Sequence, residues 1–324
     1  MRALRILAIV LIVLGLGIFG FKWWYLDSSA APETSDFEFD IDRVRKLATA
    51  VRKPRPTAIN VALVGESALP STLVVAGSGF EPRRMIFTAY QLVYPEREVI
   101  VDSALDRELA REFAEDAPFS EDAYASLQRA MLRADGIVIT HEHADHIGGI
   151  ARAESFDDLE PRLMLSREQL ENAKELSHSG FPERKAATMQ PLDYRKYHIV
   201  APGVVLIKAP GHTPGSQLVY VQLEDGREFL FVGDVAWHMD NVRELTGRPR
   251  LVSDFVLGED REAVLGQLRA LHDLMGSEKI HLVVSHDAEQ LDEYIEQGLL
   301  GAGFEEREPR AEPEPEEESS TEPA

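Results

Sequence analysis

The stretch "GIVITHEHADH", Gly136–His146, joins an apolar run to a loop with three histidines, a glutamate and an aspartate. The apolar run predicts a buried strand. His141 and His143 are two residues apart, so in extended chain both rings point to the same side. Asp145 and His146 come where the chain should turn into a helix, and they can face a second point in space. The stretch is either most of a metal site or a polar loop that is rich in histidine.

Three other apolar runs deliver the same kinds of side chain. "VVLIKA" (204–209) leads to His212, "EFLFVG" (228–233) leads to Asp234, and "IHLVVS" (280–285) leads to His286. Ligands collect at the carboxyl ends of strands in α/β sheets. The sequence therefore predicts two triplets of ligands, enough for two metal ions.

The donor types indicate which ions these are. Imidazole and carboxylate groups without thiolate suit Zn²⁺, with Mn²⁺ or Fe²⁺ as alternatives, and the chain has no cysteine. Two such ions about 3.5–4 Å apart can share a hydroxide that attacks a substrate. No Ser or Cys nucleophile is then required.

The remaining pattern predicts an α/β fold. Early strand candidates follow one another closely, and later ones alternate with helical segments, which fits two mixed β-sheets packed together with helices outside. Early candidates include "TLVVAG" (72–77), and helices are expected over 121–134 and 261–275. The pair Gly148-Gly149 should permit a close backbone approach.

The amino terminus predicts a membrane anchor at 1–27. Sixteen apolar residues, Ile6–Phe21, lie between Arg5 and Lys22, and the aromatic cluster Trp23–Tyr25 suits a membrane interface. A cleaved signal peptide is the alternative. Basic residues at the start favour a single-pass protein whose domain lies on the non-cytoplasmic, periplasmic side, although a later basic cluster (43–55) favours the opposite orientation.

We expect a linker at 28–56, a hydrolase domain at 57–302 and a disordered acidic tail at 303–324. Residues 305–324 hold nine acidic and two basic side chains and several prolines. Such a segment cannot bury enough apolar surface to offset its ordering entropy. The formal net charge of -22 argues against nucleic acid as a partner, since phosphate binding needs clustered Lys and Arg. The expected partners are a small-molecule substrate and the membrane.

Four motifs, "HEHADH", "PGHTPGS", "FVGD" and "VVSH", resemble in order and spacing those of the metallo-β-lactamase-fold hydrolases. The resemblance covers about 58–301 and implies an αβ/βα four-layer sandwich with the site at one edge between the sheets. It also implies the role of each side chain. His141, His143 and His212 would bind one metal, Asp145, His146 and His286 the other, and Asp234 would bridge the two.

The resemblance extends to residues around the metals. Asp145 would carry a proton to the leaving group, and Asp102 would orient a ligating histidine. Glu142 should point away from the metals, to solvent or a backbone partner. Asp287 is expected to cap the helix that follows it.

The bridging aspartate implies the lactonase and glyoxalase II-like branch of the family, because members that cleave β-lactams usually carry Cys or Ser there. The expected reaction is hydrolysis of a small ester, lactone or thioester. The lactonase branch often has Tyr three residues past the bridging Asp, whereas this chain has Trp237, which we interpret as a substrate-binding wall of the pocket. The alternatives are a phosphodiesterase acting on a nucleotide or phospholipid head group, and a non-catalytic membrane scaffold.

Overall fold

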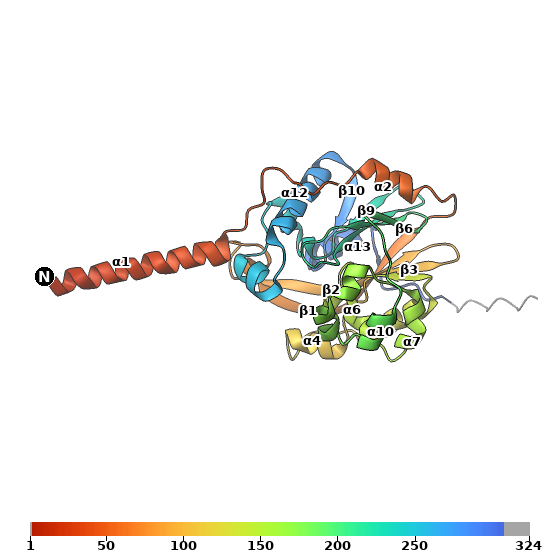
Figure 1. Cartoon of the computed structure of the whole chain (residues 1–324), viewed down its shortest axis with the longest axis horizontal. Helices are drawn as coiled ribbons and strands as arrows, with labels where there is room; N and C mark the ends of the chain where they lie inside the picture. Colours follow the sequence, from red (N-terminus) through yellow and green to blue (C-terminus); the bar gives the residue numbers. More distant parts are fainter. Residues whose placement is uncertain (1, 308–324) are drawn as a thin grey trace, which may run out of the picture.

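Two β-sheets lie face to face in the computed structural model, which describes residues 2–307. Figure 1 shows the two sheets with helices on both sides and one long helix projecting from the domain. The sheets have the strand orders β11-β1-β2-β3-β4-β5 and β10-β9-β8-β7-β6. Both are mixed: β3–β4 and β9–β10 are parallel pairs, while β1–β2 and β7–β8 are antiparallel.

The first sheet consists of β1 (Ala58–Pro70), β2 (Pro82–Val93), β3 (Glu98–Val101), β4 (Gly136–Val138), β5 (Leu163–Met164) and β11 (Gly301–Ala302). The second consists of β6 (Tyr197–Ala201), β7 (Val204–Lys208), β8 (Gln217–Gln222), β9 (Glu228–Phe231) and β10 (Ile280–Val283). Several of these strands are almost wholly buried, because sheet faces and helices cover them on both sides.

Helices complete the outer layers. Those that follow the first sheet's strands are α3 (Ser71–Val74), α4 (Arg107–Phe113), α5 (Glu121–Arg133), α6 (Ala144–Ala151), α7 (Phe156–Leu159), η2 (Glu160–Arg162), α8 (Arg167–Glu171), α9 (Ala173–Ser179) and α10 (Glu183–Thr188). The others are α2 (Ile41–Ala48), η3 (Gly233–Val235), α11 (Met239–Arg243), η4 (Leu251–Leu257), α12 (Arg261–Ser277) and α13 (Ala288–Glu296).

Three apolar clusters correspond to the interfaces between layers. One joins α4, α5 and α6 to the outer face of the first sheet, and another joins α2, α11 and α12 to the outer face of the second. The third lies between the sheets, where Ile59 and Leu92 of one meet Leu206 and Phe229 of the other. This arrangement confirms the predicted αβ/βα sandwich.

Most expected elements are present, and three of the differences have a local physical cause. "TLVVAG" is not a strand, because Val74 and Val75 turn inward against Met85 and the chain then reverses at Gly77 with φ +79°. Strand β6 was not predicted, since its residues are only partly buried. Asp145 and His146, expected where the chain turns into a helix, already lie in the first turn of α6, because the carbonyl of His143 accepts hydrogen bonds from His146 and Ile147.

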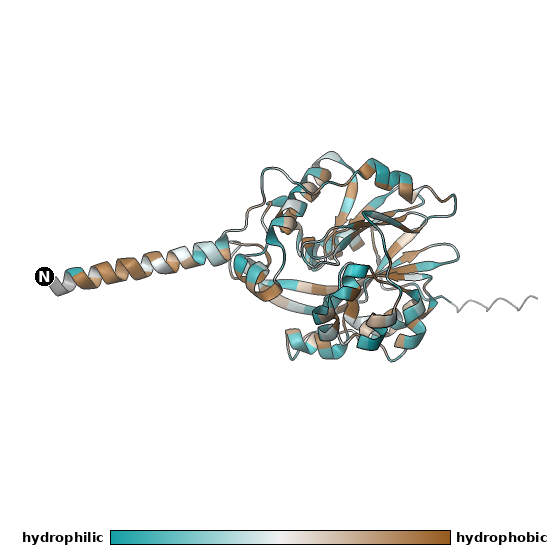
Figure 2. Cartoon of the chain, in the orientation of Figure 1, coloured by the Kyte–Doolittle hydropathy of each residue, from teal (hydrophilic) through white to brown (hydrophobic). Residues whose placement is uncertain are grey.

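The amino-terminal helix α1 (Arg2–Lys22) continues without a break into the π-helix η1 (Trp23–Asp27). Figure 2 shows apolar residues along most of α1, on a helix that stands clear of the domain. It is long and apolar enough to cross a bilayer, a property shared with signal sequences.

The segment predicted as a linker is in contact with the domain. Ser29 is buried and its hydroxyl donates to the carbonyl of Arg248 (2.5 Å), and Val44 and Ala48 of α2 are buried against the second sheet. At the other end, the backbone of Glu305 forms hydrogen bonds with Gln91. The rest of the predicted tail, 308–324, lies outside the described residues.

Candidate metal centre

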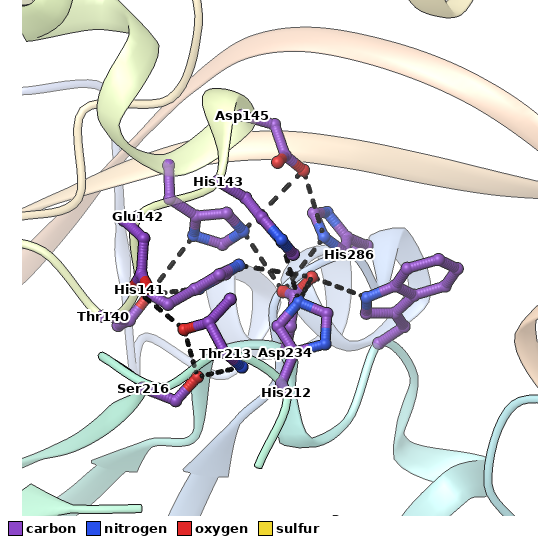
Figure 3. A network of polar contacts seen from close by, with 12 residues as sticks. Thr140, His141, Glu142, His143, Asp145, His212, Thr213, Ser216, Asp234 and His286 are labelled. Atoms are coloured by element: carbon purple, nitrogen blue, oxygen red, sulfur yellow. Dashed lines mark hydrogen bonds and ion pairs between the residues drawn. The ribbon is translucent and has the colours of Figure 1, made fainter. Parts of the chain in front are cut away.

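The seven side chains expected to bind metal lie together at one edge of the two sheets. They come from the loop after β4, the first turn of α6, the loop after β7, the η3 turn after β9 and the loop after β10. Figure 3 shows the labelled members of the group pointing toward a common centre. The structure forms two groups, His141, His143, His212 and Asp234 in one, and Asp145, His146 and His286 in the other.

In the first group the nitrogens surround one carboxylate oxygen. Oδ2 of Asp234 lies 3.3 Å from Nε2 of His212 and 3.6 Å from Nε2 of His141. His143 faces the group with its other ring nitrogen, Nδ1, which lies 2.9 Å from Nε2 of His212.

In the second group the histidines face the other oxygen of the same carboxylate. Oδ1 of Asp234 lies 3.1 Å from Nε2 of His146 and 3.2 Å from Nε2 of His286. Oδ2 of Asp145 lies 3.5 Å from Nε2 of His286. Asp234 therefore stands between the groups and offers one oxygen to each.

These distances fit divalent cations. Zinc bonds to His nitrogen of about 2.0–2.1 Å place neighbouring tetrahedral ligands ~3.3 Å apart, which is close to the separations observed. Within residues 2–307, Nε2 of His141, Nε2 of His146 and Oδ1 of Asp234 are buried and make no hydrogen bond. Buried polar atoms without partners are rare, and here all three point to the centre of the cluster.

The histidine ring nitrogens that face away from the metal cluster lie within hydrogen-bond distance of acceptors around it. Nδ1 of His146 lies 2.9 Å from Oδ2 of Asp102, the role the resemblance implied for this aspartate. Nδ1 of His286 lies 2.8 Å from the carbonyl of Ile86. A proton on Nδ1 leaves the Nε2 lone pair free for a metal, so these contacts select the ligating tautomer.

Glu259 performs the same task for His212 and was not predicted. Its buried carboxylate lies 2.9 Å from Nδ1 of His212 and also accepts from the guanidinium of Arg248. Another nitrogen of Arg248 donates to the backbone carbonyl of Asp234 (2.9 Å). No motif marks this pair, because the contact joins residues 47 positions apart.

The surroundings of the metal-binding residues favour a cation at this position. Burial, together with the neighbouring histidines, holds the pKa of His141 well below its usual value, and burial lowers the pKa of His143 to about 4. Burial alone would also lower the pKa of His146, but Asp234, Asp145 and Asp102 raise it well above normal. Carboxylates that favour a proton on His146 also favour a metal cation beside it.

Glu142 points away from the metal cluster, as expected, but it is not solvated. It is fully buried and accepts hydrogen bonds from Thr213 Oγ1 (2.9 Å), Asn172 Nδ2 (2.8 Å) and the backbone N–H of Gly215 (3.3 Å). Burial raises the pKa of its carboxyl. Glu142 therefore ties the first metal-binding loop to the loop that carries His212.

The glycine pair in α6 is needed for packing. A Cβ on Gly149 would lie 1.9 Å from the carbonyl oxygen of Ser103, and one on Gly148 would lie 2.3 Å from a methyl group of Leu109. The close approach predicted from the sequence is thus present, and it sets the position of the helix turn that carries Asp145 and His146.

Trp237 lies at the edge of the cluster. Its indole N–H donates to Oδ2 of Asp234 (2.7 Å), its ring meets that of His286 edge-on, and the guanidinium of Arg248 lies 4.8 Å from its centroid. The side chain is only partly buried, so the ring forms one side of the site.

A third cluster of histidine and carboxylate side chains consists of His238, Asp287 and Glu289. Asp287 caps α13 as predicted, accepting from the N–H of Gln290 (2.9 Å), and its other oxygen accepts from the N–H of Met239 (3.0 Å). His238 caps α11 in turn. His238 and Asp287 thus make contacts that hold α11 and α13 in place, while Glu289 is exposed.

Two curated relatives match part of the chain. N-acyl homoserine lactonase AiiA from Bacillus thuringiensis subsp. kurstaki is 27% identical over 158 residues, 48% of this chain and 56% of the relative. Hydroxyacylglutathione hydrolase from Shewanella loihica (strain ATCC BAA-1088 / PV-4) is 31% identical over 125 residues, 38% of this chain and 42% of the relative. The chain thus spans about half the length of the curated relatives it matches.

Solved structures share the fold. That of an N-acyl homoserine lactone hydrolase with N-hexanoyl-L-homoserine bound at its catalytic metal centre superposes with a TM-score of 0.58 at 19% identity, covering 74% of this chain and 96% of the other. The family model described as the metallo-beta-lactamase superfamily matches residues 88–279, more than half of the sequence. With this match and the two-sheet fold, the chain belongs to the metallo-beta-lactamase superfamily.

Proposed function

We propose that this protein is a membrane-anchored dinuclear zinc hydrolase that cleaves a small ester, lactone or thioester. The observation that carries the proposal is the position of Asp234, whose two oxygens each face a separate set of nitrogen ligands. His141, His143 and His212 would hold one cation, and Asp145, His146 and His286 the other, with Asp234 shared. Mn²⁺ or Fe²⁺ would suit the same donors.

Two divalent cations in these positions would supply water ionised near neutral pH and would polarise the scissile carbonyl. Proton transfer and substrate contact would fall to the protein's own side chains. Asp145 is partly exposed, and its Oδ2 lies 3.5 Å from Nε2 of His286 and 3.8 Å from Nε2 of His146. We assign it the transfer of a proton to the leaving alcohol or thiol, which requires a carboxylate within reach of that atom. Trp237 would form the wall against which the substrate lies.

The names of the relatives support the substrate class. The name of the lactonase designates a lactone. The name of the hydroxyacylglutathione hydrolase designates an acyl derivative of glutathione, which is a thioester. Both bonds join an acyl carbon to a leaving oxygen or sulfur, so one set of groups can serve either. The structure of residues 2–307 offers no separate feature that favours the phosphodiesterase reading.

The amino-terminal helix supports the anchor. At ~1.5 Å per residue, α1 is long enough for a hydrocarbon core of about 30 Å. Trp23 and Trp24 follow at its end, where interfacial aromatic residues belong. Arg2 and Arg5 support an amino terminus in the cytoplasm, and we propose that the domain lies on the periplasmic side.

The test is a parallel substrate screen with full-length protein in detergent. An N-acyl homoserine lactone, an S-acyl glutathione, a bis-aryl phosphodiester and a β-lactam would be compared, with Asp234→Asn as the inactive reference. We expect hydrolysis of the lactone or the thioester, lost in Asp234→Asn. Hydrolysis of the phosphodiester alone would replace the proposed class with the phosphodiesterase.

A further inference from the structure

The short π-helix η4 exposes several apolar side chains that lie close together. Phe255 is 66% exposed and Val256 70%, with Leu251 also exposed on the same element. Scattered apolar side chains are ordinary on a protein surface, whereas adjacent ones indicate a contact site. We call Leu251, Phe255 and Val256 the η4 patch.

The η4 patch adjoins the end of the apolar helix. The rings of Tyr25 and Phe255 lie 5.7 Å apart, and the guanidinium of Arg250 lies 4.3 Å from the ring centroid of Trp24. In Figure 1 the light-blue segment that contains η4 lies beside the point where α1 meets the domain. The apolar surface of α1 and η1 therefore continues onto the domain itself.

The residues that follow α1 are bonded directly to the domain. Helix α1 runs directly into η1, the carbonyl of Leu26 accepts from the N–H of Gly77 (3.1 Å), and Ser29 is already buried. If α1 spans a bilayer with Trp23 and Trp24 at its interface, this face of the domain must lie at the lipid surface. Phe255, in contact with Tyr25, is then at the depth of the interfacial aromatic residues.

Two ion pairs lie beside the η4 patch. Arg250 forms an ion pair with Asp254 (3.1 Å), and Lys22 forms one with Asp27 (2.6 Å). Pairing reduces the cost of bringing a charge toward a medium of low dielectric constant. A surface of paired charges and exposed aromatic and aliphatic groups suits the head-group region of a membrane.

We propose that the η4 patch inserts into the interface of the same lipid bilayer that holds α1, so that the domain rests on the membrane through two contacts. This inference rests on the proposed anchor. It also brings the membrane close to the metal centre, because η4 lies between Arg248 and Glu259, which contact Asp234 and His212.

The experiment exploits the absence of cysteine from the chain. Val256→Cys in the full-length protein is labelled with an environment-sensitive fluorophore and reconstituted into phosphatidylcholine vesicles containing doxyl-labelled phosphatidylcholine. Val51→Cys is the matched control, because Val51 is also exposed and follows α2, which lies on the side of the domain away from α1. Alkaline carbonate extraction of the same vesicles tests the anchor separately.

We expect strong quenching at position 256, little at 51, and retention of the protein after carbonate. Retention with equal quenching at both positions would overturn the η4 contact and leave the anchor standing. Extraction by carbonate with selective quenching at 256 at neutral pH would overturn the anchor, and with it the two-contact arrangement, and would leave only a lipid contact of η4. Extraction without quenching would refute both.

Discussion

The carboxylate of Glu259 lies 2.9 Å from Nδ1 of His212, on the side of the ring opposite the metal cluster. Burial raises the pKa of Glu259, but the charge of Arg248 and the hydrogen bond from His212 outweigh it and bring that pKa to about 2. Glu259 is therefore an anion at neutral pH. It fixes the proton of His212 on Nδ1 and leaves Nε2 facing Asp234.

Glu259→Gln should weaken metal binding by about 10–100-fold, the usual effect of removing a ligand's supporting partner. It should also destabilise the fold by about 3–5 kcal/mol, because Arg248 is left as an unpaired buried charge. Metal titration and denaturant unfolding of the apoprotein measure the two effects. Glu262→Gln, an exposed change three residues away, is the control. If Glu259→Gln binds metal as tightly as Glu262→Gln does, Glu259 does not position His212.

Asp102→Asn tests the corresponding support of the second group. The carboxylate accepts from the N–H and hydroxyl of Thr140 and from His146, so an amide would direct N–H groups at one of these donors. Asn tolerates the positive φ of 59° at this position, so the backbone need not change. We expect about 10–100-fold weaker binding of one metal equivalent, with the other unaffected. Equal weakening of both equivalents in calorimetric titration would show that the effect is not local.

Gly149→Ala should distort α6, because its Cβ would overlap the carbonyl oxygen of Ser103. We expect lower thermal stability and loss of metal from the second group, whose Asp145 and His146 lie in the same helix. Gly276→Ala is the matched control: it lies in α12 with nothing within 4 Å of an added Cβ. That change should be neutral or stabilise by up to about 1 kcal/mol. Comparable melting temperatures for the two variants would contradict the packing argument.

Trp237→Phe removes one N–H donor and retains an aromatic ring. Loss of the hydrogen bond to Asp234 should lower the free energy of unfolding by about 1.5–3 kcal/mol, the range for hydrogen bonds to charged groups. If the ring is a wall of the substrate pocket, KM should rise while the metal content stays constant. Trp237→Ala, which removes the wall, should raise KM further. Unchanged KM in both variants would show that substrate does not lie against this residue.

The sequence predicted the site residues that follow strands. It did not predict the site residues that only the tertiary fold brings next to the metal ligands. His141, His212, Asp234 and His286 each come within a few residues of an apolar run, so strand periodicity locates them. Asp102 directly follows β3, and the family resemblance, rather than strand periodicity, implied its role. Glu259 and Arg248 lie outside any strand, and only the tertiary fold brings them to His212 and Asp234.

The errors in the fold also have physical causes. "TLVVAG" has the composition of a strand, but Val74 and Val75 bury themselves against Met85 and Trp237 without joining a ladder. Glu142 has the backbone partner that was one of its two expected environments, the N–H of Gly215, but the sequence does not indicate that Thr213 and Asn172 also donate to it inside the protein. The domain boundaries stay a prediction, although α2 lies against the second sheet.

The central claim is that seven side chains converge on two cations with Asp234 between them. Elemental analysis of the purified full-length protein, together with Asp234→Asn and the exposed control Asp225→Asn, tests it most directly. We predict two divalent metal equivalents per chain in the parent and the control, and about one or fewer in Asp234→Asn. One equivalent or none in the parent, or two retained in Asp234→Asn, would contradict the account.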